Sequence, residues 1–223
     1  VIIADTFAIW ATYGFDGSHA LDFFSAWGTA LSYTFQIYFD FSGYSDMALG
    51  AAMLFSIRLP INFNSPYKAV SMSEFWRRWH ISLSTWFRDY IYFPLGGNRV
   101  STWRWYRNIL IVFMVSGLWH GANWTYVIWG ALHGVFIVAG AATQAFRERL
   151  SAALGLVRFP RFHRAFQVLA TFLLVNVGWV FFRAHSVGDA CHILSHSLQG
   201  WSAVKSVHDA RAMLFEAGFM KMD

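Results

Sequence analysis

Long apolar blocks alternate with short basic segments along this chain. The apolar blocks cover residues 21–57, 108–146 and 166–182. A helix that crosses a bilayer needs about 20 mostly apolar residues. The second block contains no Asp, Glu, Lys or Arg, and at about 1.5 Å of rise per residue it is too long for one span. It therefore predicts a hairpin of two spanning helices.

The pattern as a whole predicts an all-α, multi-pass integral membrane protein with about four to five spans, plus amphipathic helices at the membrane interface. The third block is just long enough for one span, and residues 1–13 predict the end of another. The chain begins with Val1 rather than Met and has no signal-peptide pattern. We therefore expect residues 1–223 to be part of the membrane domain of a longer protein.

Basic residues concentrate in two segments. The first 57 residues contain five Asp and no Lys or Arg, whereas residues 58–107 hold eight basic residues and residues 147–164 hold five. Basic loops next to membrane spans remain in the cytoplasm. Both segments are therefore predicted to be cytoplasmic, and the hairpin between them is predicted to turn on the outer side near residues 121–123.

Composition supports the membrane prediction and excludes several other classes of protein. Hydrophobic residues make up 57% of the chain and charged residues 13%, against about 25% charged residues in ordinary soluble domains. The net charge of +5 comes with no recognised nucleic-acid motif, so we expect a membrane face and no nucleic acid as partner. The single Cys191 rules out an intramolecular disulfide and a cysteine-rich metal site.

The segment 58–107 resembles neither a lipid-facing span nor a linker, because it is crowded with Trp, Arg, Pro and Gly. Ser71 and Glu74 have the spacing of a capping box, which predicts a helix that runs through Trp76 and His80, with both side chains on one face. Residues 94–98 predict a turn. We interpret the segment as short helices packed at the cytoplasmic interface.

His120 is the most informative candidate for chemistry. It lies in a block otherwise without strongly ionisable side chains, and polar groups inside a membrane usually face a cavity or the interior of a helix bundle. The glycines on both sides, Gly117 and Gly121, permit close approach of a substrate or a helix. The alternative is a histidine that only hydrogen-bonds between helices or lies at the outer interface.

The other polar candidates each have a simpler explanation. His80 is a second candidate, or an interfacial histidine among tryptophans, and His133 fits a packing residue. His192 and His196 have the i, i+4 spacing of metal ligands but lack further ligands, so a surface helix is favoured. The polar residues 40–46 form either the outer turn of a hairpin or the lining of a polar cavity. No nucleophile elbow surrounds any of the serines singled out as potential nucleophiles, which are Ser42, Ser45, Ser82 and Ser84.

Six motifs in colinear order resemble the membrane-bound O-acyltransferase (MBOAT) family, above all its bacterial alginate O-acetylation branch, which is related to the D-alanyl transfer protein of teichoic acid modification. The resemblance runs from about residue 29 to residue 134. The motifs are 41–46 (FSGYSD), 62–67 (NFNSPY), 75–84 (FWRRWHISLS), 86–92 (WFRDYIY), 94–98 (PLGGN) and 117–121 (GLWHG). Family members are roughly twice as long as this chain, so the resemblance implies that N-terminal spans are missing.

The resemblance implies a function and two site residues. The hallmark intramembrane histidine of the family corresponds to His120, expected as general base, and its partner histidine corresponds to His80, expected as a second catalytic or donor-positioning residue. The co-substrate is expected to be an acyl thioester, either acetyl-coenzyme A or an acyl carrier protein, with no bound metal. The resemblance further implies the bacterial inner membrane and, as partner, a separate extracytoplasmic acetyltransferase.

Two rival functions stay open from the sequence. One is a transporter or flippase in which His120 and residues 40–46 line the pathway, although no inverted repeat is found in the sequence to favour it. The other is a haem or metal protein that uses His80, His120 and His133. The acceptor also stays open between alginate, another exopolysaccharide, peptidoglycan and an acyl-relay protein.

Overall fold

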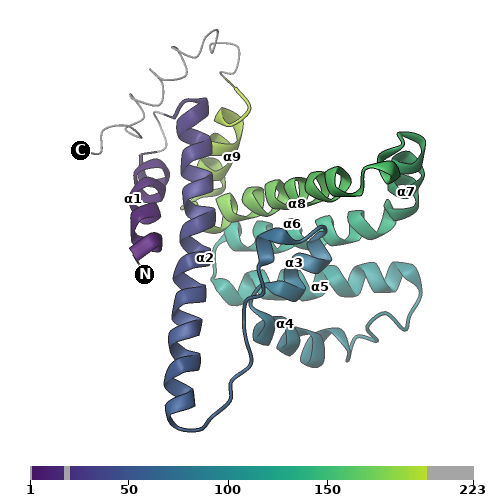
Figure 1. The fold of residues 1–223 in the computed structure, drawn as a ribbon, viewed down its shortest axis with the longest axis horizontal. Helices are drawn as coiled ribbons and strands as arrows, with labels where there is room; N and C mark the ends of the chain where they lie inside the picture. The colour runs from purple at the N-terminus through teal and green to yellow at the C-terminus, as the bar shows by residue number, and fades with distance from the viewer. Residues whose placement is uncertain (1, 18–20, 200–223) are drawn as a thin grey trace. The chain divides into compact units, whose positions relative to one another are not determined.

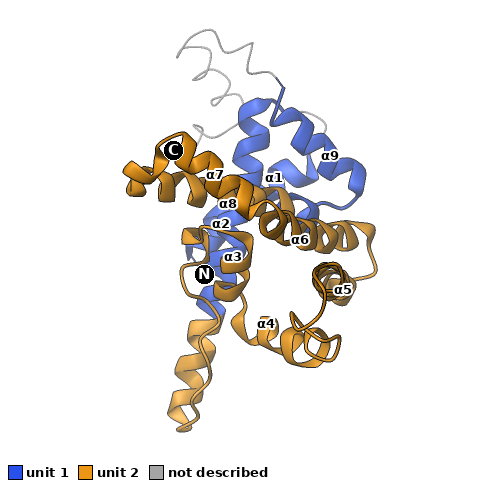
Figure 2. Cartoon of the chain, turned by 90° about the vertical axis from the view of Figure 1, so that its right-hand side faces the viewer, with its two compact units in different colours: residues 1–44, 179–223 blue, residues 45–178 orange. Residues whose placement is uncertain are grey.

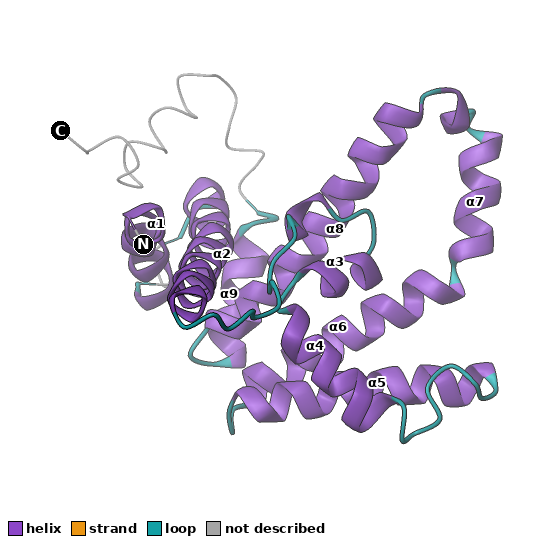
Figure 3. Ribbon diagram, turned by 60° about the horizontal axis from the view of Figure 1, so that its bottom comes forward, coloured by secondary structure: helices purple, strands orange, loops and turns teal. Residues whose placement is uncertain are grey.

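The computed structural model describes residues 2–17 and 21–199, and every regular element among them is helical (Figure 1; Figure 3). The elements are α1 (Ile2–Asp16), α2 (Phe23–Leu54), η2 (Pro66–Lys68), α3 (Met72–Arg78), α4 (Ile81–Phe87), the π-helical turn η3 (Arg88–Tyr92), α5 (Thr102–His120), α6 (Trp124–Ala142), α7 (Gln144–Ala153), η4 (Leu156–Arg158), α8 (Pro160–Arg183) and α9 (Val187–His196). No strand is found in this part of the chain, so the all-α prediction is confirmed there.

The chain divides into two compact units, coloured separately in Figure 2. Unit 1 comprises residues 1–44 and 179–223, and unit 2 comprises residues 45–178. Unit 1 is held together by contacts between its two sequence segments. The Asp16 carboxylate lies 3.0 Å from His185 Nε2, and the Trp27 indole N–H donates to the Ser197 carbonyl at 2.9 Å. Every candidate site residue from α3 to α6 lies in unit 2.

The predicted hairpin of residues 108–146 is confirmed as the antiparallel pair α5 and α6. Asn123 caps α6 by accepting a hydrogen bond from the Thr125 N–H at 3.0 Å. Glycines let the two backbones approach closely. A Cβ on Gly130 would lie 2.2 Å from the Phe113 carbonyl oxygen, and a Cβ on Gly117 would lie 2.4 Å from the Tyr126 carbonyl oxygen. Small residues at such crossings are the usual means of packing helices in membranes.

Two helices among the described residues are long and apolar enough to cross a membrane, α6 and α8. They match the second half of the predicted hairpin and the predicted third span. Helix α5, the first half of the hairpin, carries Arg104 and Arg107 in its first two turns. The predicted total of four to five spans stays a prediction.

Residues 21–57 do not contain the turn considered for residues 40–46. Helix α2 runs without interruption from Phe23 to Leu54, so the interpretation as an outer hairpin turn is wrong. A helix tolerates isolated polar residues when their side chains point outward, and Asp40, Tyr44 and Asp46 are exposed. The polar residues therefore change the surface of one long helix and do not end it.

Segment 58–107 contains short, packed helices, as expected, and also the first turns of α5. Ser71 caps α3 by accepting a hydrogen bond from the Glu74 N–H, and the Glu74 carboxylate accepts one from the Val70 N–H at 2.8 Å. The predicted turn at residues 94–98 is confirmed, and the buried Asn108 amide of α5 holds it by donating to the carbonyls of Leu95 and Gly97. The predicted single helix through His80 is wrong, because α3 ends at Arg78.

Candidate active site

His120 is the last residue of α5, and its half-buried ring packs against the aromatic face of α6. The centroid of its ring lies 5.0 Å from that of Trp129, with the two rings nearly perpendicular at 88°, and 6.3 Å from that of Tyr126. Trp129 is only 1% exposed. The indole therefore forms a fixed wall that sets the position of the His120 imidazole.

The end of the hairpin around His120 is open. Leu118, Trp119 and Trp124 are 59%, 60% and 74% exposed. Large exposed aromatic side chains are typical of the membrane–water interface and of surfaces that meet another segment or a ligand. His120 thus combines one fixed side with an approach that the described residues leave open.

His80 lies at a corner between α3 and α4, and not on a helix face with Trp76. Its backbone adopts the left-handed conformation, with φ 42° and ψ 58°, which few residues other than glycine adopt, although histidine is among them more often than most. Asn62 holds this corner. Its carbonyl accepts from the Ile81 N–H, and its side-chain oxygen accepts from the Ser82 N–H at 3.1 Å and the Ser82 hydroxyl at 2.7 Å.

The His80 imidazole is half-buried, and burial lowers its pKa from the ordinary value. The neutral ring, which is able to accept a proton, therefore predominates at neutral pH. His80 and His120 are also close enough to interact electrostatically. The structure thus brings together the two histidines that the sequence analysis selected, from positions 40 residues apart in the chain.

His133 lies behind the same wall and is completely buried. Its Nδ1 accepts a hydrogen bond from the Trp76 indole N–H at 3.3 Å, so the proton of the neutral ring is on Nε2. The Trp129 ring packs against His133 at 5.1 Å between centroids, as it also packs against His120. The expectation of a packing residue agrees with this position.

A pair of half-buried histidines, one of which packs against a buried indole, suits proton transfer. Histidine titrates near neutral pH and is the commonest general base in enzymes. Ser82 lies next to this pair in the sequence, but its hydroxyl is engaged by Asn62, which agrees with the absence of a nucleophile elbow. Within residues 2–17 and 21–199, no three His, Cys, Asp or Glu side chains are grouped to bind a metal.

The remaining candidates lie far from His80 and His120 in the sequence. Residues 40–46 belong to the middle of α2. His192 and His196 stack on one face of the amphipathic helix α9, with ring centroids 4.1 Å apart, as expected for a surface helix.

Four residues that shape the site were not singled out for a role from the sequence. Trp129 packs between His120 and His133, Trp76 donates a hydrogen bond to His133, Asn62 fixes the His80 corner, and Asn108 anchors the turn before α5. Asn62, Trp76 and Asn108 make specific hydrogen bonds. In the sequence, these residues are recognisable only as asparagines and tryptophans inside or beside dense motifs. Such a position does not reveal which distant residue the side chain will contact.

Comparison with protein-family models identifies one match. The model described as MBOAT, membrane-bound O-acyltransferase family, matches residues 2–182. The match extends well beyond residues 29–134, to which the motif resemblance was assigned, and includes most of α8.

Several named bacterial proteins are similar to the chain. A peptidoglycan O-acetyltransferase of Helicobacter pylori is 47% identical over 93% of the chain and 38% of its own length. A probable alginate O-acetylase AlgI of Pseudomonas aeruginosa is 49% identical over 84% of the chain and 34% of its own length. A teichoic acid D-alanyltransferase of Streptococcus thermophilus is 34% identical over 70% of the chain and 40% of its own length. The chain thus spans about two fifths or less of these relatives.

Proposed function

The chain belongs to the membrane-bound O-acyltransferase family, and from that premise we propose that it carries the catalytic histidines of a multi-pass enzyme of the bacterial inner membrane. The enzyme transfers an acyl group, acetyl in our proposal, from a cytoplasmic thioester to a hydroxyl of a cell-surface polysaccharide. The observation that carries the proposal is the pair of half-buried histidines, His80 at the corner before α4 and His120 packed against the buried Trp129.

In the proposed reaction, the acceptor hydroxyl oxygen attacks the thioester carbonyl carbon. His120 accepts the hydroxyl proton as the new C–O bond forms, the C–S bond breaks, and the proton passes to the departing thiolate. General-base catalysis of this kind contributes about 10²–10⁴-fold to the rate. His80 serves as the second catalytic or donor-positioning residue. A membrane-embedded site limits wasteful hydrolysis of the thioester because it excludes water.

The orientation in the membrane follows from the basic segments. Arg104 and Arg107 at the start of α5 and residues 147–164 face the cytoplasm, and the turn at residues 121–123 faces the outer side, in agreement with the positive-inside rule. Segment 58–107 reaches from the cytoplasmic face towards this turn, because Phe87 packs against Trp119 at 6.5 Å between ring centroids. The thioester donor, acetyl-coenzyme A or an acyl carrier protein, then approaches from the side of His80. The hydroxyl acceptor approaches from the side of His120.

The names of the relatives support a cell-envelope polymer as the final acceptor. They name peptidoglycan, alginate and teichoic acid as the modified polymers. Because the peptidoglycan and alginate relatives differ in acceptor at 47% and 49% identity, we assign the class of acceptor and not one polymer. A separate extracytoplasmic acetyltransferase is the partner that we propose for delivery to the sugar.

Replacement of His120 in the full-length protein tests the mechanism. His120→Gln keeps hydrogen-bonding ability but cannot act as the base, so we expect acyl transfer to fall by about 10²-fold or more while the protein stays in the membrane. His196→Gln in α9 is the matched control and retains activity. Near-normal transfer by the His120→Gln protein would remove the catalytic assignment. Transport without thioester cleavage by the wild type would instead favour the transporter.

A further inference from the structure

A groove on one side of α8 combines three cations with apolar walls. It is an open groove of about 500 Å³ between η2 and the first half of α8. Lys68, Arg161 and Arg164 line it together with apolar side chains that include Leu169 and Phe172. Tyr67 and Phe172 meet edge to face at 5.4 Å between centroids and join its two sides.

The three cations are not neutralised by neighbouring carboxylates. None of them forms an ion pair within residues 2–17 and 21–199. The carboxylates of the two basic segments are occupied elsewhere: Glu74 pairs with Arg78, Asp89 with Arg88, and Glu148 accepts a hydrogen bond from Gln144. The groove therefore carries a net positive charge that favours an anionic ligand.

The position of the groove along α8 indicates the depth at which its ligand lies. Helix α8 is one of the two candidate spans, and after Arg164 it contains no charged residue until Arg183. Arg161 and Arg164 thus mark the end of an uncharged stretch, where headgroups lie in a bilayer. Beyond them, Phe166, Leu169 and Leu173 are exposed along one side of the helix.

We propose that this groove binds an anionic phospholipid, with its phosphate at Lys68, Arg161 and Arg164 and an acyl chain along Leu169 and Leu173. Cations at headgroup depth followed by an exposed apolar stripe match the two ends of such a molecule. An acidic carrier protein fits less well, because it would use the cations and leave the apolar wall uncovered. This site is independent of the proposed acyl transfer.

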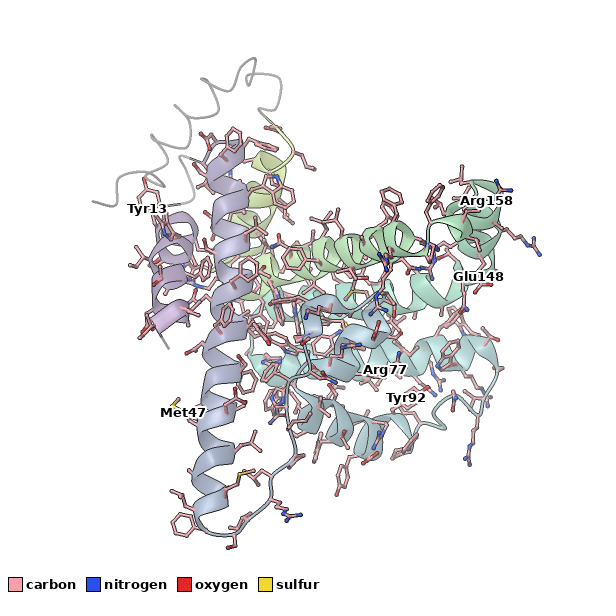
Figure 4. All side chains as sticks on the ribbon, in the orientation of Figure 1. Tyr13, Met47, Arg77, Tyr92, Glu148 and Arg158 are labelled. Atoms are coloured by element: carbon pink, nitrogen blue, oxygen red, sulfur yellow. The ribbon has the colours of Figure 1, made fainter. Side chains whose placement is uncertain are left out.

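The test compares lipid binding by two variants of the full-length protein, purified in a non-ionic detergent and freed of lipid. One variant carries Lys68→Gln, Arg161→Gln and Arg164→Gln. The control carries Arg99→Gln, Arg149→Gln and Arg158→Gln, three exposed basic residues that do not line the groove. Arg158, the last residue of η4, is labelled in Figure 4. Both variants lose the same net charge, so a general surface effect would weaken them equally.

We expect the wild type and the control to bind phosphatidylglycerol at least about tenfold more tightly than phosphatidylcholine, and the groove variant to lose this preference. Binding is measured with labelled lipid or by native mass spectrometry, with no readout of activity. If the groove variant is not recovered, Arg164→Gln against Arg158→Gln carries the same test with a loss of about fivefold.

Three results would overturn the proposal. The first is an unchanged phosphatidylglycerol preference in the groove variant. The second is displacement of the lipid by inorganic phosphate at equal concentration, which would show that the acyl chain contributes nothing. The third is an acidic carrier protein that binds through these three cations while phosphatidylglycerol does not.

Discussion

The surroundings of His133 and of His120 differ sharply, although Trp129 packs against both rings. His133 is completely buried, hydrogen-bonded to Trp76 and enclosed by aromatic rings. His120 is half-buried, and its neighbours Trp119 and Trp124 are largely exposed. We call the buried surroundings of His133 the closed region and the exposed end of the hairpin around His120 the open region. The closed region fixes the position of Trp129, and the open region leaves the His120 ring within reach of another molecule. Whether a histidine inside a membrane protein has a packing role or a catalytic role is therefore judged from its contacts and exposure, and not from its depth alone.

The largest effect on stability is expected from separating α5 and α6 at Gly130, the residue next to Trp129. A Cβ there would lie 2.2 Å from the Phe113 backbone oxygen, so Gly130→Ala forces α5 and α6 apart. We expect a loss of about 3 kcal/mol or more in the free energy of unfolding, and little recovered protein. Thermal unfolding of the full-length protein in detergent measures the change.

Gly140→Ala provides the control for this prediction. Gly140 lies on the same helix, but an added Cβ would meet no atom within 4 Å. We expect equal or slightly higher stability, because alanine favours a helix more than glycine does. Equal behaviour of the two variants would contradict the close packing of the hairpin.

A smaller effect is expected from the hydrogen bond inside the closed region. His133→Leu leaves the Trp76 indole N–H without its acceptor, at a cost of about 1–3 kcal/mol in the free energy of unfolding. A double-mutant cycle with Trp76→Phe isolates the pair, and we expect the two losses to overlap by about 1 kcal/mol. Trp103→Phe, at a residue that is 77% exposed, serves as the control. Strictly additive losses would show that the two rings do not depend on each other.

The smallest effect is a dependence on pH at His80. Burial lowers the pKa of His80 in the folded state, while the unfolded chain has the ordinary value of about 6.5. The stabilising contribution of the neutral ring is thus present above pH about 6.5 and is lost as the pH falls towards the lowered pKa, because the unfolded state takes up the proton first.

His80→Asn removes the titrating group and keeps a residue that tolerates the left-handed conformation. We expect the variant to lose less stability than the wild type between pH 7.5 and pH 5, as followed by thermal unfolding. Parallel loss in both proteins would mean that the folded state does not disfavour the charged His80 ring.

The elements that depend on local signals were predictable from the sequence. The uncharged length of residues 108–146 predicted the hairpin, the Ser71 and Glu74 spacing predicted the start of α3, and residues 94–98 predicted a turn. Each depends on neighbouring residues only. The family was also predictable, because six short motifs occur in one order.

The errors arose where distant residues decide the local structure. The pattern after Ser71 allows a helix through His80, but Asn62 holds residues 81 and 82 and the chain turns at His80 instead. The polar residues 40–46 resemble a turn, yet α2 continues because outward-pointing side chains cost a helix little. The proximity of His80 and His120, and the packing of Trp129 against His120, depend on contacts between distant segments, so the residues at either position alone do not predict them.

Gly178 couples α8 to the closed region and limits how this protein can diverge. A Cβ at Gly178 would lie 2.4 Å from His133 Nε2. An alanine at position 178 therefore requires a smaller side chain at position 133. A lineage that changes Gly178 first meets this clash with the His133 ring, whereas one that first replaces His133 meets only the smaller loss of the Trp76 hydrogen bond. Positions 133 and 178, 45 residues apart, are therefore expected to change as a pair and in that order.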